Sequence, residues 1–171
     1  LANQATVDLL NQEGLAITYD QYLTLSLGKV DEEAFKDLQT QFNCSFDADF
    51  LERVYSHIIN TFTQDLQPIS GVQTLLDQLQ ISKCVASSSR RDRLNHSLQV
   101  TGLWESFNGA VYSASEVGRG KPAPDVFLHA AKQFQADPKD CLVIEDSSAG
   151  VRAAVAAKMP VIGFVGGEHC R

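Results

Sequence analysis

The pattern that most constrains the fold begins after Pro68, where short apolar runs alternate with stretches of helical spacing. Runs of this length are typical of buried strands. The four runs are Cys84-Val85-Ala86, Ala110-Val111-Tyr112, Leu142-Val143-Ile144 and Val161-Ile162-Gly163-Phe164. Strands that alternate with helices are joined by right-handed crossovers, so the pattern predicts a doubly wound α/β core with a parallel sheet.

The first 64 residues carry helical patterns instead. The clearest lies between Phe50 and Phe62, where apolar side chains recur every three or four residues and so share one helix face. Weaker stripes cover residues 2–10, which Gly14 follows in a typical helix stop position, and residues 35–42. We therefore predict two domains, an all-helical one over residues 1–64 and the α/β core over residues 65–171.

The charge and the cysteines narrow the classes of partner. The chain has 171 residues and a formal net charge of -7, whereas binding to a nucleic acid or an anionic membrane requires a basic surface. Its four cysteines show no CxxC spacing, and no apolar run approaches the roughly 18 residues of a membrane span. These features predict a cytoplasmic enzyme with reduced thiols that binds neither nucleic acid nor membrane.

A polar cluster follows the first apolar run. In an open parallel sheet, ligands bind at the carboxyl ends of the strands, which is where these residues are expected to lie. The cluster consists of Ser87, Ser88, Ser89, Arg90 and Arg91. Hydroxyls, backbone amides near a helix start and guanidinium groups together suit a phosphate. A serine helix cap followed by solvated arginines is the alternative interpretation.

Two further features carry charge at strand ends or in loops. Glu145 and Asp146 follow the third run, and adjacent carboxylates suit Mg²⁺, which takes few carboxylates together with substrate phosphate and water. Alternatively, Asp146 caps the next helix and Glu145 is an exposed residue at a strand end. Lys121 lies in a loop stiffened by Pro122 and Pro124, which either fixes the position of the ammonium or is only a connection.

The order of these three features resembles the haloacid dehalogenase-like (HAD) superfamily, in the phosphatase and β-phosphoglucomutase branch that has a helical cap. Lys121 follows Ser87 by 34 residues, and Asp146 follows Lys121 by 25. The resemblance covers essentially the whole chain, with residues 1–64 as the cap. It implies an α/β HAD core, Mg²⁺ as the cofactor and a small phosphorylated metabolite as the substrate.

The resemblance also implies roles for individual residues. Ser87 would donate a hydrogen bond to the transferring phosphoryl group, and Lys121 would balance charge between the nucleophile and the phosphate. Glu145 and Asp146 would hold Mg²⁺. Residues that would contact the phosphate or a more distant part of the substrate are Ser88, Ser89, Arg90 and Arg91. Gly28 matches the glycine at which the family's cap approaches the active site, and Lys29 beside it is a candidate specificity residue.

The family's nucleophile signature, Asp-x-Asp-Gly-Thr/Val, is not in this sequence. The resemblance places it upstream of Leu1, on the central strand of the sheet, and we also expect the end of the core to lie beyond Arg171. A sheet without its central strand has two unpaired edges. We therefore expect the 171 residues alone to have no phosphatase activity.

Taken together, the motifs predict a Mg²⁺-dependent hydrolase of small phosphomonoesters, such as sugar phosphates, that forms an aspartyl-phosphate intermediate. A β-phosphoglucomutase-like isomerase would share every core motif, although Asn3 stands where that branch has a cap histidine. A third alternative is a non-catalytic phosphate-binding module. The joint presence of Ser87, Lys121, Glu145 and Asp146 argues against the third.

Overall fold

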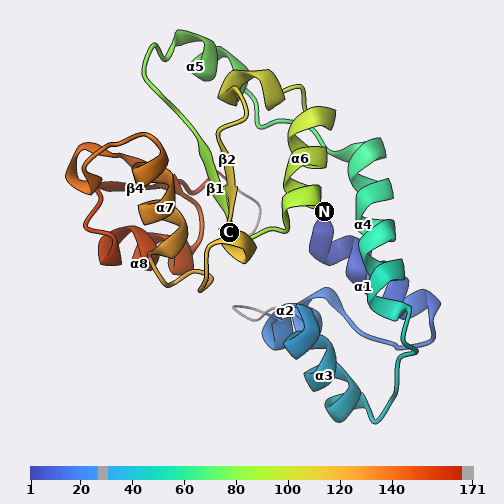
Figure 1. Cartoon of the computed structure of the whole chain (residues 1–171). Coiled ribbons are helices and arrows are strands. Elements are labelled where there is room, and N and C mark those ends of the chain that lie inside the picture. The colour runs from blue at the N-terminus through green and yellow to red at the C-terminus, as the bar shows by residue number, and fades with distance from the viewer. Residues whose placement is uncertain (27–30, 167–171) are drawn as a thin grey trace. The chain divides into compact units, whose positions relative to one another are not determined.

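The computed structural model describes residues 1–26 and 31–166, and the chain divides into two compact units, Leu1–Gln67 and Pro68–Arg171 (Figure 1). The domain division predicted after residue 64 falls inside the helix Phe50–Asp65. Among the described residues, no helix is both long and apolar enough to cross a membrane.

Four helices make up the described part of the first unit. They are α1 (Ala2–Gln12), α2 (Tyr19–Ser26), α3 (Asp31–Phe42) and α4 (Phe50–Asp65). The helix predicted from Phe50 continues one turn beyond Phe62, and Gly14 follows α1 with a φ of 91°, a conformation that glycine adopts readily. The apolar periodicity thus predicted α1, α3 and α4, but α2 was not predicted from it.

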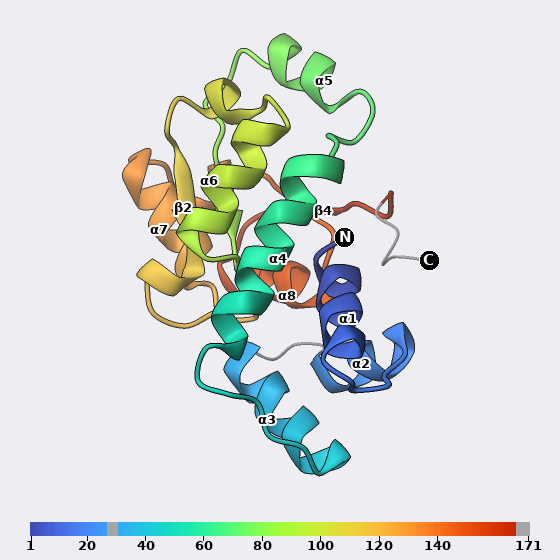
Figure 2. The same cartoon turned by 90° about the vertical axis from the view of Figure 1, so that its right-hand side faces the viewer.

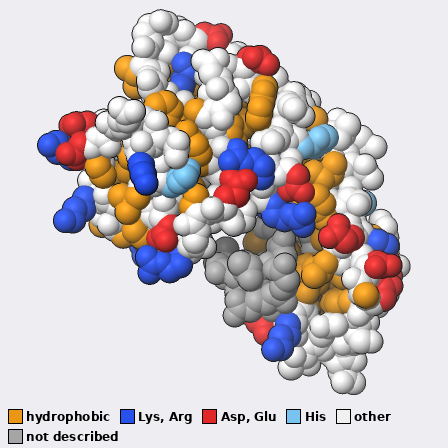
Figure 3. Space-filling model, in the orientation of Figure 1, with side chains coloured by type: hydrophobic (Ala, Val, Ile, Leu, Met, Phe, Trp, Pro, Cys, Tyr) orange, Lys and Arg blue, Asp and Glu red, His pale blue; other side chains and the backbone are white. Residues whose placement is uncertain are grey.

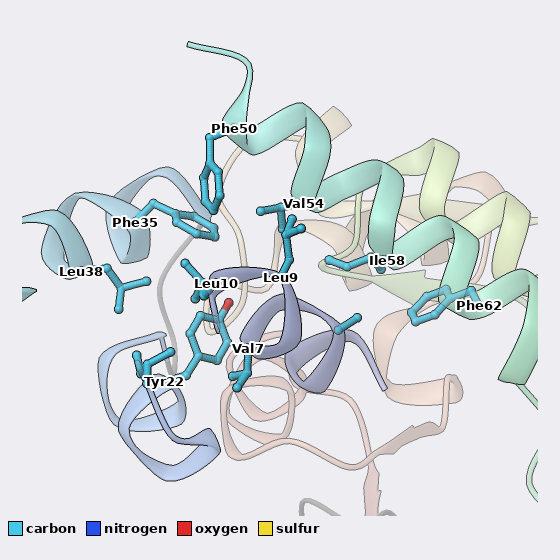
Figure 4. Packing of buried hydrophobic residues seen from close by; sticks show 12 residues of the cluster. Val7, Leu9, Leu10, Tyr22, Phe35, Leu38, Phe50, Val54, Ile58 and Phe62 are labelled. Atoms are coloured by element: carbon cyan, nitrogen blue, oxygen red, sulfur yellow. The ribbon is translucent and has the colours of Figure 1, made fainter. Parts of the chain in front are cut away.

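The core of the helical unit forms where α1 lies alongside α4 (Figure 2). Leu10, Leu38 and Phe50 are fully buried there, and they pack with the apolar faces of the neighbouring helices (Figure 4). The Phe50 ring stacks on the Phe46 ring with centroids 4.1 Å apart and meets the Phe35 ring edge-on at 5.5 Å. Burial of each of these large side chains contributes roughly 1.5–3 kcal/mol to the stability of the unit.

The second unit alternates helices and strands as predicted, which confirms its α/β class. Its helices are α5 (Val72–Gln78), α6 (Arg91–Val100), α7 (Asp125–Gln133) and α8 (Ser148–Ala156), with short 3-10 helices at η1 (Trp104–Phe107), η2 (Ala114–Glu116) and η3 (Pro138–Asp140). Its strands are β1 (Val85–Ser87), β2 (Val111–Ser113), β3 (Val143–Glu145) and β4 (Val161–Gly163). The first three strands lie one residue later than their apolar runs, so each ends on a polar residue.

The strands are parallel but form two separate pairs in the described part of the chain, not one continuous sheet. β1 pairs with β2, and β3 pairs with β4 with Ile144 opposite Ile162. One face of the second pair packs on α7 and α8, where Val143 is buried. On its other face, Ile144 and Ile162 are 58% and 52% exposed, although parallel strands are usually covered on both faces.

The surface carries charges of both signs. On the face shown in Figure 3, Lys and Arg side chains are interspersed with Asp and Glu. Among the described cysteines, Cys44, Cys84 and Cys141 are free and half-buried. Burial, together with the neighbouring Cys141, raises the pKa of Cys84 to about 11. The Cys84 thiol is therefore protonated and unreactive at neutral pH.

Candidate active site

The side chain of Lys121 connects the ends of two strands that belong to different pairs. Its Nζ donates a hydrogen bond to the backbone oxygen of Ala86 in β1 at 3.1 Å and another to Oε2 of Glu145 in β3 at 2.8 Å. Lys121 and Glu145 are both almost fully buried. The loop before α7, the end of β1 and the end of β3 therefore meet at one ammonium group, which brings Ser87 and Asp146, the neighbours of these acceptors, to the same region.

Both carboxylate oxygens of Glu145 accept hydrogen bonds. Oε2 accepts from Lys121, and Oε1 accepts from the hydroxyl of Ser147 at 2.7 Å and from its backbone N–H at 3.2 Å. Burial raises the pKa of Glu145, but the hydrogen bonds from Lys121 and Ser147 outweigh this effect and hold the pKa below its usual value. Glu145 is therefore ionised at neutral pH and paired with a cation.

The helix that follows β3 is capped by Ser147. Its Oγ accepts a hydrogen bond from the backbone N–H of Gly150 at 3.0 Å, as is typical of a serine N-cap. The alternative prediction that Asp146 caps this helix is wrong, and so is the alternative that Glu145 is exposed, because Lys121 draws it inward. Asp146 is exposed at the end of β3 and can face a ligand there.

Gly150 leaves the space that the Glu145 carboxylate occupies. A Cβ atom at this position would lie 2.0 Å from Cδ of Glu145 and 2.3 Å from its Oε1. Any side chain at position 150 would overlap with the carboxylate. The run from Glu145 to Gly150 is thus a single unit in which the glycine makes room, the serine orients and the glutamate pairs with Lys121.

The predicted phosphate loop follows β1 and is tied down from β2. Ser87 is the last residue of β1, and its Oγ accepts from the backbone N–H of Ser89 at 3.1 Å. The backbone oxygen of Ser89 accepts from Oγ of Ser113, a fully buried residue at the end of β2, at 2.7 Å. Ser88 between them is exposed. The helix α6 starts with Arg90 as its N-cap and has no side-chain cap, so the alternative of a serine helix cap is wrong.

The arginines near this loop have protein partners. Arg91 donates through Nε to Glu116 at 2.8 Å and also binds the backbone oxygen of Val111. The hydrogen bond from Arg91 holds the pKa of Glu116 below its usual value. Arg90 pairs with Asp92 at 3.1 Å. Their predicted contact with substrate stays a prediction.

The loop that carries Lys121 is fixed at its far end by Asp125. The Asp125 carboxylate accepts from the backbone N–H and the guanidinium of Arg119, and this pairing lowers its pKa. Within the same segment, Nζ of Lys121 lies over the ring of Phe127 at 4.7 Å from its centroid. These contacts add to the stiffening of the Lys121 loop that is expected from Pro122 and Pro124.

Several residues of this network were not predicted from the sequence, and two predicted site residues cannot be compared with the structure. Ser113, Phe127, Ser147 and Gly150 were not singled out, although Ser113 ends an apolar run just as Ser87 does, and the same rule would have found it. Gly28 and Lys29 lie outside the described residues.

The chemistry of the donors at the end of β3 fits Mg²⁺. No group of three or more His, Cys, Asp or Glu side chains arranged to hold a metal is present in the described ranges. Mg²⁺ does not need one, because it is often held by one or two carboxylates plus substrate phosphate and water. An ionised carboxylate has about four lone-pair sites. Glu145 uses three of them on Lys121 and Ser147, so it retains capacity beside Asp146.

Comparison with known proteins points to one family. The family model described as haloacid dehalogenase-like hydrolase matches residues 1–164. The chain is 30% identical over 139 residues to the bifunctional riboflavin kinase/FMN phosphatase of Arabidopsis thaliana, covering 80% of this chain and 37% of that protein. It is 29% identical over 119 residues to 6-phosphogluconate phosphatase of Escherichia coli (69% and 54%) and 36% identical over 120 residues to β-phosphoglucomutase of Bacillus subtilis (68% and 51%). The chain thus spans about half or less of the length of these relatives.

Solved structures agree with the sequence comparison. A conserved haloacid dehalogenase-like protein of Agrobacterium tumefaciens superposes with a TM-score of 0.82 at 32% identity, covering 98% of this chain and 77% of that one. A HAD family hydrolase of Deinococcus radiodurans with bound phosphate and sodium gives 0.77 at 30% identity, covering 99% and 76%.

Proposed function

Because this chain belongs to the haloacid dehalogenase-like hydrolase family, we propose that the protein is a Mg²⁺-dependent phosphatase of small phosphorylated metabolites. The observation that carries the proposal is the buried ion pair of Lys121 and Glu145, which joins the end of β1 to the end of β3. A buried cation next to a serine-rich loop and a carboxylate pair is the arrangement that phosphoryl transfer requires.

In the proposed reaction, the protein positions the phosphoryl group and offsets the charge on its oxygens. Ser87 donates a hydrogen bond to a phosphoryl oxygen, and Ser88 and Ser89 supply hydroxyls and backbone amides beside it. Lys121 balances the negative charge that the nucleophile and the phosphate bring together. The nucleophile is an aspartate carried on a strand outside this sequence, and it forms an aspartyl-phosphate that water then hydrolyses.

Asp146 and Glu145 would hold Mg²⁺ in this proposal. When bound, the ion would neutralise charge on the phosphoryl oxygens. Lys121 has a separate task, because its ammonium keeps Glu145 ionised and in place.

The relatives support sugar phosphates as the substrate class, since one is a 6-phosphogluconate phosphatase and another a β-phosphoglucomutase. The 36% identity to the second favours a β-phosphoglucomutase-like isomerase as the second candidate function. Substrate choice through Gly28 and Lys29 remains part of the proposal.

The test is to incubate the complete protein with a panel of phosphomonoesters, with Mg²⁺ or with a chelator, and to measure released inorganic phosphate. We expect release from sugar phosphates that stops when Mg²⁺ is removed. Interconversion of sugar 1- and 6-phosphates without net release would establish the isomerase instead. Tight binding of phosphoesters without turnover of either kind would overturn both.

A further inference from the structure

The aromatic ring of Phe127 forms one side of the site that holds the Lys121 ammonium. We propose that Phe127 is a positioning residue, whose ring face fixes the ammonium of Lys121 for its role toward the phosphoryl group through a cation–π contact. The inference rests on the proposed function and deepens it. Its basis is the distance of 4.7 Å between Nζ of Lys121 and the centroid of the Phe127 ring, over which the ammonium lies.

Lysine needs such support, because its charge sits at the end of a flexible four-carbon stem. The ammonium donates two hydrogen bonds, one to the Ala86 backbone oxygen and one to Oε2 of Glu145. An ammonium has three donors, so one proton is left for a ligand. The ring holds the cation by attraction to its π-face without using a donor.

The ring is also suited to a site that must accept a phosphate. A further carboxylate would hold the ammonium as well, but its negative charge would repel the phosphoryl oxygens. A phenyl ring attracts the cation by its quadrupole and adds no net charge. The attraction is strongest when the cation is desolvated, and Lys121 and Phe127 are 8% and 6% exposed.

Packing makes the ring a rigid support. Phe127 is part of the buried cluster between α7, β3 and α8, together with Val126, Val143 and Ala153. The ring and the ammonium are only six residues apart in the chain, on the loop and first turn of α7. The Phe127 contact is therefore local to the Lys121 segment, whereas Ala86 and Glu145 belong to distant strands.

A series of fluorinated phenylalanines at position 127 of the complete protein tests the electrostatic part of this role. Fluorine withdraws charge from the ring face in steps and changes its size little. We expect kcat to fall stepwise by about tenfold in total with little change in KM, the scale of a desolvated cation–π contact. The same series at Phe134, a half-exposed residue at the end of α7, should leave kcat unchanged.

A second readout does not depend on turnover. The rate at which acetic anhydride acetylates Lys121, measured by mass spectrometry relative to the exposed Lys132 of the same segment, should rise stepwise with fluorination at position 127. If the relative rate of Lys121 acetylation did not change with the number of fluorine atoms, the inference would be overturned, whatever the effect on activity. A wild-type protein without phosphatase activity would overturn the proposed function instead, and the acetylation series would still decide the Phe127 contact.

Discussion

Nζ of Lys121 and Oε2 of Glu145 lie 2.8 Å apart, in an ion pair whose side chains are only 8% and 9% exposed. Such a pair contributes little net stability when complete, because both charges have been removed from water. Loss of one partner is costly, because the other charge is then buried without compensation. The pair therefore couples the fold of the α/β unit to the chemistry of the candidate site.

We predict that Glu145→Gln lowers the free energy of unfolding by about 3 kcal/mol near neutral pH. Since the pKa of Glu145 is lower in the folded state than its usual value of 4.5, the unfolded state takes up the proton first as the pH falls. The wild-type advantage is thus complete above that value and is lost as the pH falls through the folded pKa. Urea unfolding at a series of pH values from about pH 7 downward measures this, and the difference in unfolding free energy between the wild type and Glu145→Gln should shrink as the pH falls below the usual pKa of Glu145.

Glu116→Gln is the matched control for this prediction. Its ion pair with Arg91 is partly exposed, at 41% and 36%, and exposed pairs are worth at most about 1 kcal/mol. Glu116→Gln should therefore lower the free energy of unfolding by less than Glu145→Gln does. Equal losses in both variants would show that burial of the Lys121 pair has no special importance.

Gly150→Ala should disrupt the same pair from the side of α8. The new Cβ would lie 2.0 Å from Cδ of Glu145, so the carboxylate or the helix must move, at a cost of about 2–4 kcal/mol. A double variant with Glu145→Ala should be no less stable than Glu145→Ala alone, because the overlap is then gone. Gly163→Ala is the control, since a Cβ there meets nothing within 4 Å. Additive losses in the double variant would contradict this explanation.

Lys121→Ala in the complete protein should reduce kcat for phosphomonoesters by about two orders of magnitude or more, the scale observed when a preorganised charge is removed. Lys132→Ala removes an exposed lysine of α7 and should leave kcat unchanged. Steady-state kinetics with Mg²⁺ measure both, and thermal unfolding confirms that each variant is folded. Near-normal turnover by Lys121→Ala would show that this residue does not act on the phosphoryl group.

The sequence predicted the elements better than their connections. The helix from Phe50 was clear because its apolar period is strong, and the strands were found as apolar runs. Their ends were placed one residue early, because Ser87 and Glu145 are polar yet complete β1 and β3. The bond from Lys121 to the Ala86 backbone oxygen could not be predicted, since every residue carries such an acceptor and only the tertiary fold selects one.

Ser113 offers the last test, because it acts on the phosphate loop from a neighbouring strand. Its Oγ is fully buried and donates to the backbone oxygen of Ser89, so Ser113→Ala leaves that oxygen without this donor. We expect a loss of about 1–2 kcal/mol in unfolding free energy. We also expect weaker binding of inorganic phosphate, by several-fold, because the backbone between Ser87 and Arg90 is less fixed.

Ser115→Ala is the control, since it removes the exposed hydroxyl that contacts Ser113 but leaves the bond to Ser89 intact. Calorimetric titration of the complete protein with phosphate and Mg²⁺ measures the effect. Equal phosphate affinity in Ser113→Ala and Ser115→Ala would show that β2 does not control this loop.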